Sequence, residues 1–301
     1  MDNGLVNDIA AINREIDSIA NNSELFVACN FCERADAIDH LEFWITGRVD
    51  GMLAQHGKYH DLLLLQTKNE QIKASLELVD KCLFQQLKAE LINGLYRGED
   101  FKNLVGQYID LTKGEPDGRY DNLDLFVNRL LPASDWPAQS IDLEPEMVYY
   151  QKTPARVVFE MAQQCGLITT DVFFDIGCGL GQVAILISLL TGAQVKGIEI
   201  DPAFCAYSVA CAGQLNLNNI EFLTTDARDA DYTQGTCFFM YSPFTGVMLD
   251  SVLERIRRQT ADRQIRVITY GPCTAQVARQ SWLTMVSGNV ENNYRLALFS
   301  S

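Results

Sequence analysis

Apolar residues recur at helical spacing through roughly the first 130 residues of the chain. Leu5, Ile9, Ile12, Ile16 and Ile19 stand four or three positions apart, which places them on one face of a helix. Similar spacing predicts further helices over residues 34–53, 59–92, 100–111 and 123–131. We therefore expect an all-α N-terminal domain.

The pattern changes near residue 150 to short apolar runs that alternate with helical segments. Thr153 is predicted to cap a helix that has Pro154 at its first position and runs through Cys165. Strands are predicted at residues 172–176, 195–200, 220–224, 236–241 and 265–270. Such alternation favours a parallel sheet with helices on both faces.

The end of the chain breaks this rhythm. Residues 282–287 and 294–299 are strand-like, and the polar segment 288–293 joins them without a helix. A hairpin with an antiparallel strand at the sheet edge is expected here. Pro137 and Pro145 bracket a predicted linker, and 301 residues suffice for two domains. We expect a helical domain over residues 1–140 and an α/β domain over residues 141–301.

The loop after the first predicted strand carries the most specific motif. It begins at Asp175 and continues with Gly177, Gly179 and Gly181 as D-x-G-x-G-x-G, followed by an apolar helix. Ligands of parallel sheets bind beyond the carboxyl ends of the strands, and glycine lets the backbone approach them closely. The spacing differs from the G-x-G-x-x-G that seats a pyrophosphate. A carboxylate, Glu199, ends the second strand twenty residues after Gly179.

These residues resemble the class I S-adenosylmethionine-dependent methyltransferases. The resemblance implies a Rossmann-like seven-stranded sheet whose last strand is antiparallel, as the tail suggests. It also implies that Gly177 and Gly179 face the methionine part of S-adenosylmethionine, while Asp175 orients the loop and accepts from the ligand's ammonium. Gly181 and Gln182 complete the cofactor loop of this motif.

Two carboxylates, Glu199 and Asp226, follow the glycine loop in the order that the family requires. Glu199 can accept hydrogen bonds from both ribose hydroxyls, whereas Asp201, before Pro202, suits a helix N-cap. In the segment 220–227, the resemblance assigns the adenine amino group to Asp226 and the adenine ring to the amide of Ala227. A turn-forming role after the strand is the alternative for Asp226.

The fourth strand leads into Ser242-Pro243-Phe244, where amine-methylating relatives often carry Asn/Asp-Pro-Pro-aromatic. By this partial resemblance, Ser242 would accept a hydrogen bond from a target amine and Phe244 would pack against the methyl group. A loop after a buried strand, without a catalytic role, is the alternative. Positioning supplies most of what methyl transfer needs, so a general base is not required.

A more remote resemblance covers residues 150–245. Tyr150-Gln151-Lys152-Thr153 and the glycine stretch are similar to segments of the non-SET histone-lysine methyltransferases. The resemblance implies that Tyr150 and Thr153 contact the cofactor. The chain departs from that family at Ser242-Pro243-Phe244 and has no basic arm, so a histone acceptor is not implied.

Charge and cysteine usage narrow the class of protein. The formal net charge is −15, which disfavours a nucleic-acid partner. No apolar run reaches the length of a membrane span, and the start of the chain lacks a signal-peptide pattern. Nine scattered cysteines favour reduced thiols in a cytoplasmic protein. Cys29 and Cys32 form a C-x-x-C, but His56 and His60 follow too far after Cys32 for a zinc finger, so no metal is expected.

Together these features predict a methyltransferase that uses S-adenosylmethionine and methylates an amine of a protein or small molecule. The helical domain is expected to cover the cofactor crevice, select the acceptor or mediate formation of a homodimer. Two alternatives stay open. One is a cofactor-binding regulatory protein without transfer activity, and the other is an NAD-dependent dehydrogenase that uses the same residues.

Overall fold

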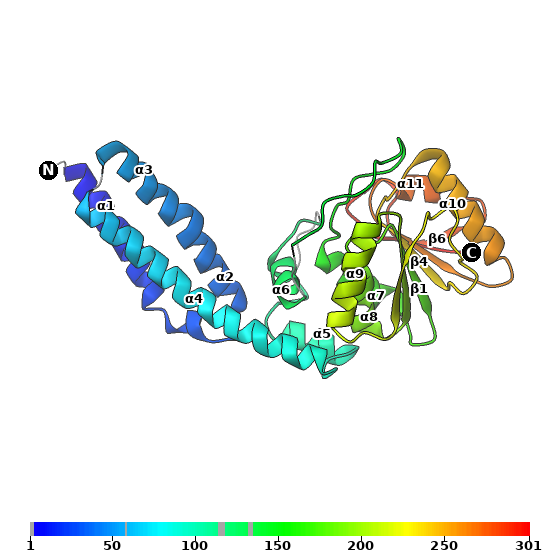
Figure 1. Cartoon of the computed structure of the whole chain (residues 1–301), viewed down its shortest axis with the longest axis horizontal. Coiled ribbons are helices and arrows are strands. Elements are labelled where there is room, and N and C mark those ends of the chain that lie inside the picture. Colours follow the sequence, from blue (N-terminus) through cyan, green and yellow to red (C-terminus); the bar gives the residue numbers. More distant parts are fainter. Residues whose placement is uncertain (1–2, 58, 114–117, 132–134) are drawn as a thin grey trace. The chain divides into compact units, whose positions relative to one another are not determined.

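The computed structural model describes residues 3–57, 59–113, 118–131 and 135–301. The chain divides into two compact units (Figure 1). One comprises Met1–Ala89 with Val105–Asp110, and the other comprises Glu90–Leu104 with Leu111–Ser301. We call them the helical unit and the sheet unit. The domain boundary near residue 140 remains a prediction about which part of the chain folds independently.

The helical unit is built from long helices packed around aliphatic side chains. Its elements are α1 (Asn3–Ala20), the 3₁₀ turn η1 (Ser23–Phe26), α2 (Phe31–Asp39), the π-helical η2 (His40–Ile45), α3 (Thr46–His56) and most of α4 (His60–Ile92). The helix expected at 34–53 is the continuous run of α2, η2 and α3. Ile12, Ile16, Ile38, Leu41 and Leu76 lie in its core, so the spacing seen in the sequence marks the buried face.

A buried ion pair ties the start of this unit together. The guanidinium of Arg34 donates to Asp80 Oδ1 at 2.6 Å, and neither side chain is more than 4% exposed. Nη1 of Arg34 donates to the carbonyl oxygens of Leu25 and Val27, at 3.1 and 2.8 Å, and Nη2 donates to Ala28 O at 3.2 Å. Arg34 therefore holds the turn after α1 against α4.

The sheet unit contains seven strands and the helices that cover them. Its helices are most of α5 (Glu99–Gly106), α6 (Asn122–Leu130), α7 (Ala155–Gln164), α8 (Gln182–Thr191), α9 (Pro202–Gln214), α10 (Gly246–Gln259) and α11 (Thr274–Val277). Its strands are β1 (Val172–Ile176), β2 (Gln194–Glu199), β3 (Ile220–Thr224), β4 (Cys237–Met240), β5 (Arg266–Thr269), β6 (Thr284–Ser287) and β7 (Ala297–Ser300).

The strands are ordered β3-β2-β1-β4-β5-β7-β6. The pairs among β1 to β5 are parallel, and β7 pairs antiparallel with both β5 and β6. The predicted Rossmann-like sheet with an antiparallel last strand is confirmed. Because β7 is inserted between β5 and β6, the edge strand on this side of the sheet is β6.

Two helix starts were predicted from the sequence, and one of them is wrong. Asp201 caps α9, accepting from Ala203 N at 2.8 Å with Pro202 in the first turn, as expected. Thr153 does not cap α7, because Pro154 occupies the N-cap position and Ala155 begins the helix. Asp124 of α6 accepts from Ala155 N at 2.8 Å and replaces the missing cap.

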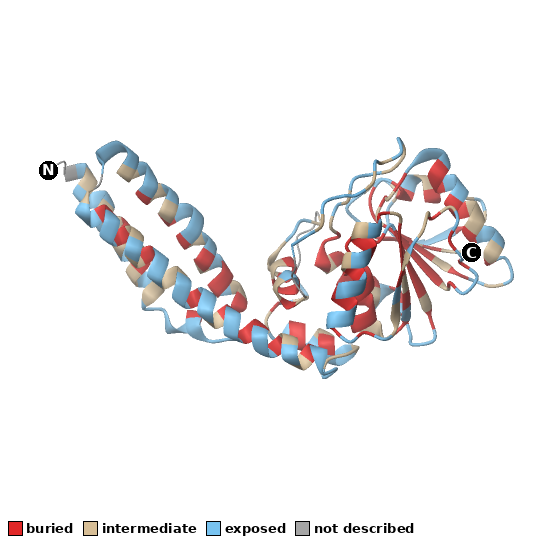
Figure 2. Ribbon diagram, viewed as in Figure 1, coloured by how far each residue is buried: buried red, intermediate tan, exposed pale blue. Residues whose placement is uncertain are grey.

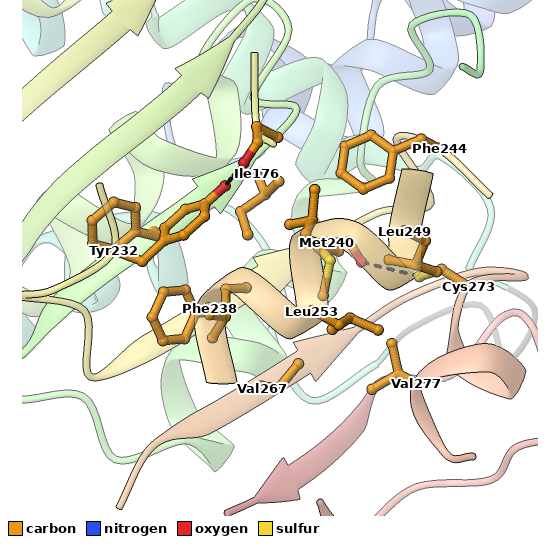
Figure 3. Close-up of a cluster of buried hydrophobic side chains, with 14 of the residues drawn as sticks. Ile176, Tyr232, Phe238, Met240, Phe244, Leu249, Leu253, Val267, Cys273 and Val277 are labelled. Carbon is orange, nitrogen blue, oxygen red and sulfur yellow. Dashed lines mark hydrogen bonds between the residues drawn. The ribbon is translucent and has the colours of Figure 1, made fainter. Parts of the chain in front are cut away.

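One hydrophobic cluster of the sheet unit lies between the strands and α10 (Figure 3). The strands of the sheet centre are almost continuously buried (Figure 2), as expected where helices cover both faces. Tyr232 lies in this core, and its hydroxyl donates to Ala227 O at 2.8 Å. In the part of the chain described, no helix combines the length and apolarity of a membrane span.

Candidate functional site

A cavity of about 400 Å³ opens at the carboxyl ends of the parallel strands, within the size range of small-molecule sites. It lies where the strand order reverses between β1 and β4, the usual ligand position in such sheets. Eleven predicted site residues line it: Tyr150, Thr153, Asp175, Gly177, Gly179, Gln182, Glu199, Asp226, Ala227, Ser242 and Phe244. The twelfth, Gly181, lies outside the wall, at the N-cap of α8 against Ser208.

The loop after β1 requires glycine for both conformation and space. Gly177 and Gly179 have φ angles of 73° and 54°, in a left-handed backbone region that residues with a side chain rarely adopt. A Cβ on Gly179 would stand 2.2 Å from the Tyr150 ring, and one on Gly177 would stand 2.4 Å from Cβ of Pro243. The segment with Tyr150 and the loop with Pro243 therefore pack directly against this loop.

Glu199 connects the end of β2 to the same loop. Its Oε2 accepts from Gly179 N and its Oε1 from Asp201 N, both at 2.8 Å. Burial raises the pKa of Glu199, while the hydrogen bonds from the amides of Asp201 and Gly179 act in the opposite direction. Each carboxylate oxygen keeps a lone pair for a further donor, so a pair of ribose hydroxyls fits this group.

Asp175 and Gln182 supply polar atoms that have no partner in the protein. Asp175 Oδ2 and both polar side-chain atoms of Gln182 are buried in the part of the chain described, yet make no hydrogen bond. Burial, with a smaller contribution from the charge of Glu199, raises the pKa of Asp175 to about 7. Buried groups of this kind usually have partners. A ligand with both donors and acceptors, such as an amino acid, fits the wall that they form.

Asp226 is already engaged in an ion pair. Arg228 donates to Asp226 Oδ2 at 2.6 Å and to Glu144 Oε1 at 2.7 Å. The hydrogen bond from Arg228 is the largest cause of the lowered pKa of Asp226. Asp226 thus stays ionised at the wall, whereas its role toward adenine remains a prediction.

Residues 139–151, which we call the strap, form one side of the cavity. Ser140 N donates to Asp201 Oδ2 at 2.7 Å, and Val148 N donates to Pro243 O at 3.0 Å. The carboxylate of Glu146 accepts from Met248 N at 2.6 Å, at the start of α10. The sequence suggested a linker between Pro137 and Pro145 and a cofactor contact at Tyr150, but no local pattern indicates these long-range contacts.

The predicted catalytic residues occupy different environments. Ser242 Oγ accepts from Cys273 N at 2.9 Å and donates to Tyr270 O at 3.3 Å, so its hydroxyl joins two loops. Phe244 is 6% exposed and belongs to the hydrophobic core as well as to the cavity wall (Figure 3). Their predicted roles toward an acceptor remain predictions.

Sequence reasoning missed the outer part of the cavity. Met147 of the strap, Tyr241 after β4, and Asn293 with Tyr294 before β7 also line it. Four carboxylates lie in the wall: Asp175, Glu199, Asp201 and Asp226. Among the described residues that line the cavity, none is lysine, arginine or histidine. The wall is therefore suited to a neutral or cationic ligand.

Comparison with known proteins agrees with this geometry. Residues 173–266 match a family model described as a methyltransferase domain, which spans β1 to the start of β5 and contains most of the predicted cofactor residues. No curated protein matches the chain.

Several solved structures resemble the chain over about half its length. An RNA methyltransferase from Salinibacter ruber, in complex with S-adenosyl-L-homocysteine, is 23% identical with a TM-score of 0.41, covering 50% of this chain and 92% of that protein. A precorrin-6y C5,15-methyltransferase from Geobacter metallireducens is 16% identical with a TM-score of 0.39, covering 51% and 91%. At these identities and TM-scores the likeness transfers no acceptor to this chain.

Proposed function

Given that the chain is an S-adenosylmethionine-dependent methyltransferase, we propose that it methylates an amine of a protein or a small molecule. The observation that carries this proposal is the composition of the cavity wall. Four carboxylates and several aromatic rings face the ligand space, while no described lining residue is lysine, arginine or histidine. An ammonium group is attracted to such a wall, whereas a phosphate or carboxylate acceptor is repelled.

The cofactor assignments are part of the same proposal. Asp175 and Gln182 offer unpartnered buried atoms to the amino-acid end, next to Gly177 and Gly179. Glu199 accepts the ribose hydroxyls. Asp226 and the amide of Ala227 hold the adenine.

Tyr150 and Thr153 are proposed to contact the cofactor from the strap side. The ring of Tyr150 lies against Gly179 and makes an edge-on contact with Phe204, at 5.8 Å between centroids. This position supports the role implied by the remote resemblance to the non-SET histone-lysine methyltransferases. The resemblance is restricted to these contacts, and a histone acceptor is not proposed.

The cofactor supplies a methyl group that is already activated on a sulfonium. The chain has to bind and orient the acceptor and let an ammonium lose its proton. Since no described lining residue is a histidine or lysine, the proton is expected to leave to water. Desolvation beside Tyr241, Phe244 and Tyr294 lowers the pKa of an ammonium and favours the neutral, nucleophilic amine, whereas the carboxylates of the wall act in the opposite direction.

Cofactor binding without transfer is the second candidate function. The hydroxyl of Ser242 is occupied by Cys273 and Tyr270, which leaves the expected acceptor-binding group engaged elsewhere. Methyl transfer to any acceptor would exclude this candidate.

For the helical unit we propose acceptor selection or homodimer formation, which light scattering with and without acceptor distinguishes.

Transfer from methyl-labelled S-adenosylmethionine tests the amine proposal. The acceptors are spermidine, N-acetyl-lysine methylamide and a lysine-rich peptide, each compared with an acetylated counterpart that has lost its charge. RNA oligonucleotides and dicarboxylates serve as anionic acceptors. We expect label only in the free amines, rising with pH as the amine deprotonates. Label in RNA or in a carboxylate would contradict the proposal.

A further inference from the structure

Tyr241 directly follows β4 and faces the cavity beside the glycine loop. Its ring packs edge-on against Tyr270, with 4.8 Å between centroids, and a Cβ on Gly271 would lie 3.1 Å from the Tyr241 ring. These neighbours fix the orientation of the ring. Tyr241 is half-buried and lines the cavity together with Tyr294.

The hydroxyl of Tyr241 is available for a ligand. Within the described residues it makes no hydrogen bond, although the ring is held on both sides. Burial, followed by the neighbouring phenol of Tyr270, raises the pKa of Tyr241 to about 12. The phenol therefore stays protonated near neutral pH, where its oxygen can accept a hydrogen bond but cannot serve as a general base.

The neighbouring Ser242 cannot offer its hydroxyl to a ligand without breaking the hydrogen bonds that join the loops after β4 and β5. Ser242 has a φ of 42°, uncommon for a side chain-bearing residue, and is 6% exposed. Its hydroxyl is held by Cys273 N and Tyr270 O. These contacts keep the loop after β4 in the conformation that presents Tyr241.

The loop that carries Tyr241 also touches the proposed donor loop. Cβ of Pro243 would meet a Cβ on Gly177 at 2.4 Å, so no side chain separates the two segments. If Gly177 faces the methionine part of the cofactor, the acceptor nitrogen has to arrive beside this contact. Tyr241 stands two residues from Pro243 and lines the same cavity as Gly177.

We propose that the Tyr241 hydroxyl accepts a hydrogen bond from the acceptor amine, in a subsite completed by Asn293 and Tyr294. The aromatic rings offer their negative faces to a cation, and the amide oxygen of Asn293 offers a second acceptor. The substrate class is then an alkylamine with an apolar stem. This inference rests on the proposed amine methylation and assigns its acceptor-binding residue.

Binding of two cofactor analogues separates this inference from the cofactor assignment. S-Adenosylhomocysteine lacks the methyl group, whereas sinefungin carries a primary amine near the position of the transferred methyl. Calorimetry gives the ratio of their dissociation constants for wild type and Tyr241→Phe, which keeps the ring and removes the hydroxyl. We expect wild type to prefer sinefungin and the variant to lose roughly tenfold of that preference, with S-adenosylhomocysteine binding unchanged.

Tyr96→Phe is the matched control, because this tyrosine of the sheet unit bonds Glu90 and does not line the cavity. Its ratio should equal that of wild type. A Tyr241→Phe protein that binds S-adenosylhomocysteine normally and keeps the full preference for sinefungin would overturn the inference. Wild type that binds neither analogue would instead overturn the cofactor assignment, and this inference with it. Melting temperatures verify that both variants are folded.

Discussion

Pro243 lies so close to Gly177 that a Cβ on the glycine would stand 2.4 Å from the Cβ of the proline. The contact joins the loop after β4 to the loop after β1, and Gly177 adopts a φ of 73° there. The proposed donor and acceptor segments are thereby held at van der Waals contact. The relative position of the two segments depends on the absence of a side chain at Gly177.

Gly177→Ala should therefore impair both stability and ligand binding. The left-handed backbone alone costs about 1–2 kcal/mol with a side chain, and displacement of Pro243 adds to this. We expect a lower melting temperature and at least tenfold weaker binding of S-adenosylhomocysteine. Gly213→Ala in α9 is the control, because no atom lies within 4 Å of its Cβ position and alanine favours helix. Equal binding by Gly177→Ala and wild type would contradict the close contact.

The raised pKa of Asp175 predicts how stability without ligand depends on pH. The folded-state pKa is about 7, above the ordinary value of 3.8, so the folded protein binds more protons between these pH values. The Asp175 contribution therefore lowers stability as pH rises from about 4 to about 7. Asp175→Asn removes this contribution. Its melting temperature should therefore be higher than that of wild type at pH 8 and the same as that of wild type at pH 4. Thermal denaturation at both pH values measures the difference.

The same titration should control binding of a ligand with an ammonium group. Wild type is expected to bind S-adenosylhomocysteine more tightly as pH rises from 5.5 to 8, because ionised Asp175 attracts the ammonium. Asp175→Asn should bind more weakly at pH 8 and show a flatter profile. Parallel profiles for the two proteins would show that Asp175 does not face the ligand.

Glu146 connects the strap to α10, because its carboxylate accepts from Val247 N at 3.1 Å and Met248 N at 2.6 Å. These amides belong to the first turn of α10, where backbone N–H groups have no partner within the helix. Glu146→Ala should lower the unfolding free energy by about 1 kcal/mol and expose the strap to limited proteolysis. Asp142→Ala, at an exposed position of the same segment, should change neither. A strap equally resistant in both variants would argue against this attachment.

Local patterns were sufficient to predict the sheet and much of the cofactor wall. The strand pattern identified β1 and β3 at their observed bounds, and Asp201 caps α9 as its Pro neighbour suggested. These features depend on residues adjacent in sequence. The glycine loop and Glu199 were recognisable for the same reason, because strand, turn and helix follow within a few residues.

The acceptor side depends on contacts between distant segments, which local patterns do not encode. Val148 meets Pro243 across 95 positions, and Asn293 reaches the cavity from the segment before β7. Thr153 was assigned as a cap because Asp124, some 30 residues earlier, gives no local sign that it reaches Ala155. Tyr241 was passed over because Ser242 resembled a known motif more closely.

The buried pair of Arg34 and Asp80 predicts a large effect in the helical unit. Asp80→Ala leaves a guanidinium with 0% exposure without its counter-ion. Loss of one partner of a buried pair costs about 3–5 kcal/mol. Glu77→Ala, also in α4, removes only an exposed pair with Lys73 at 3.9 Å and should cost under about 1 kcal/mol. Similar denaturant midpoints for the two variants would contradict the role of the buried pair.

Calorimetric titration of S-adenosylhomocysteine into wild type and Glu199→Gln tests the cofactor site most directly. Glu221→Gln on β3, 56% exposed beside Lys196, is the control for removal of a carboxylate. We predict one ligand per wild-type chain, unchanged binding by the control, roughly 10- to 100-fold weaker binding by Glu199→Gln, and no competition from NAD. Tighter binding of NAD than of S-adenosylhomocysteine, or a Glu199→Gln protein that binds like wild type, would contradict the account.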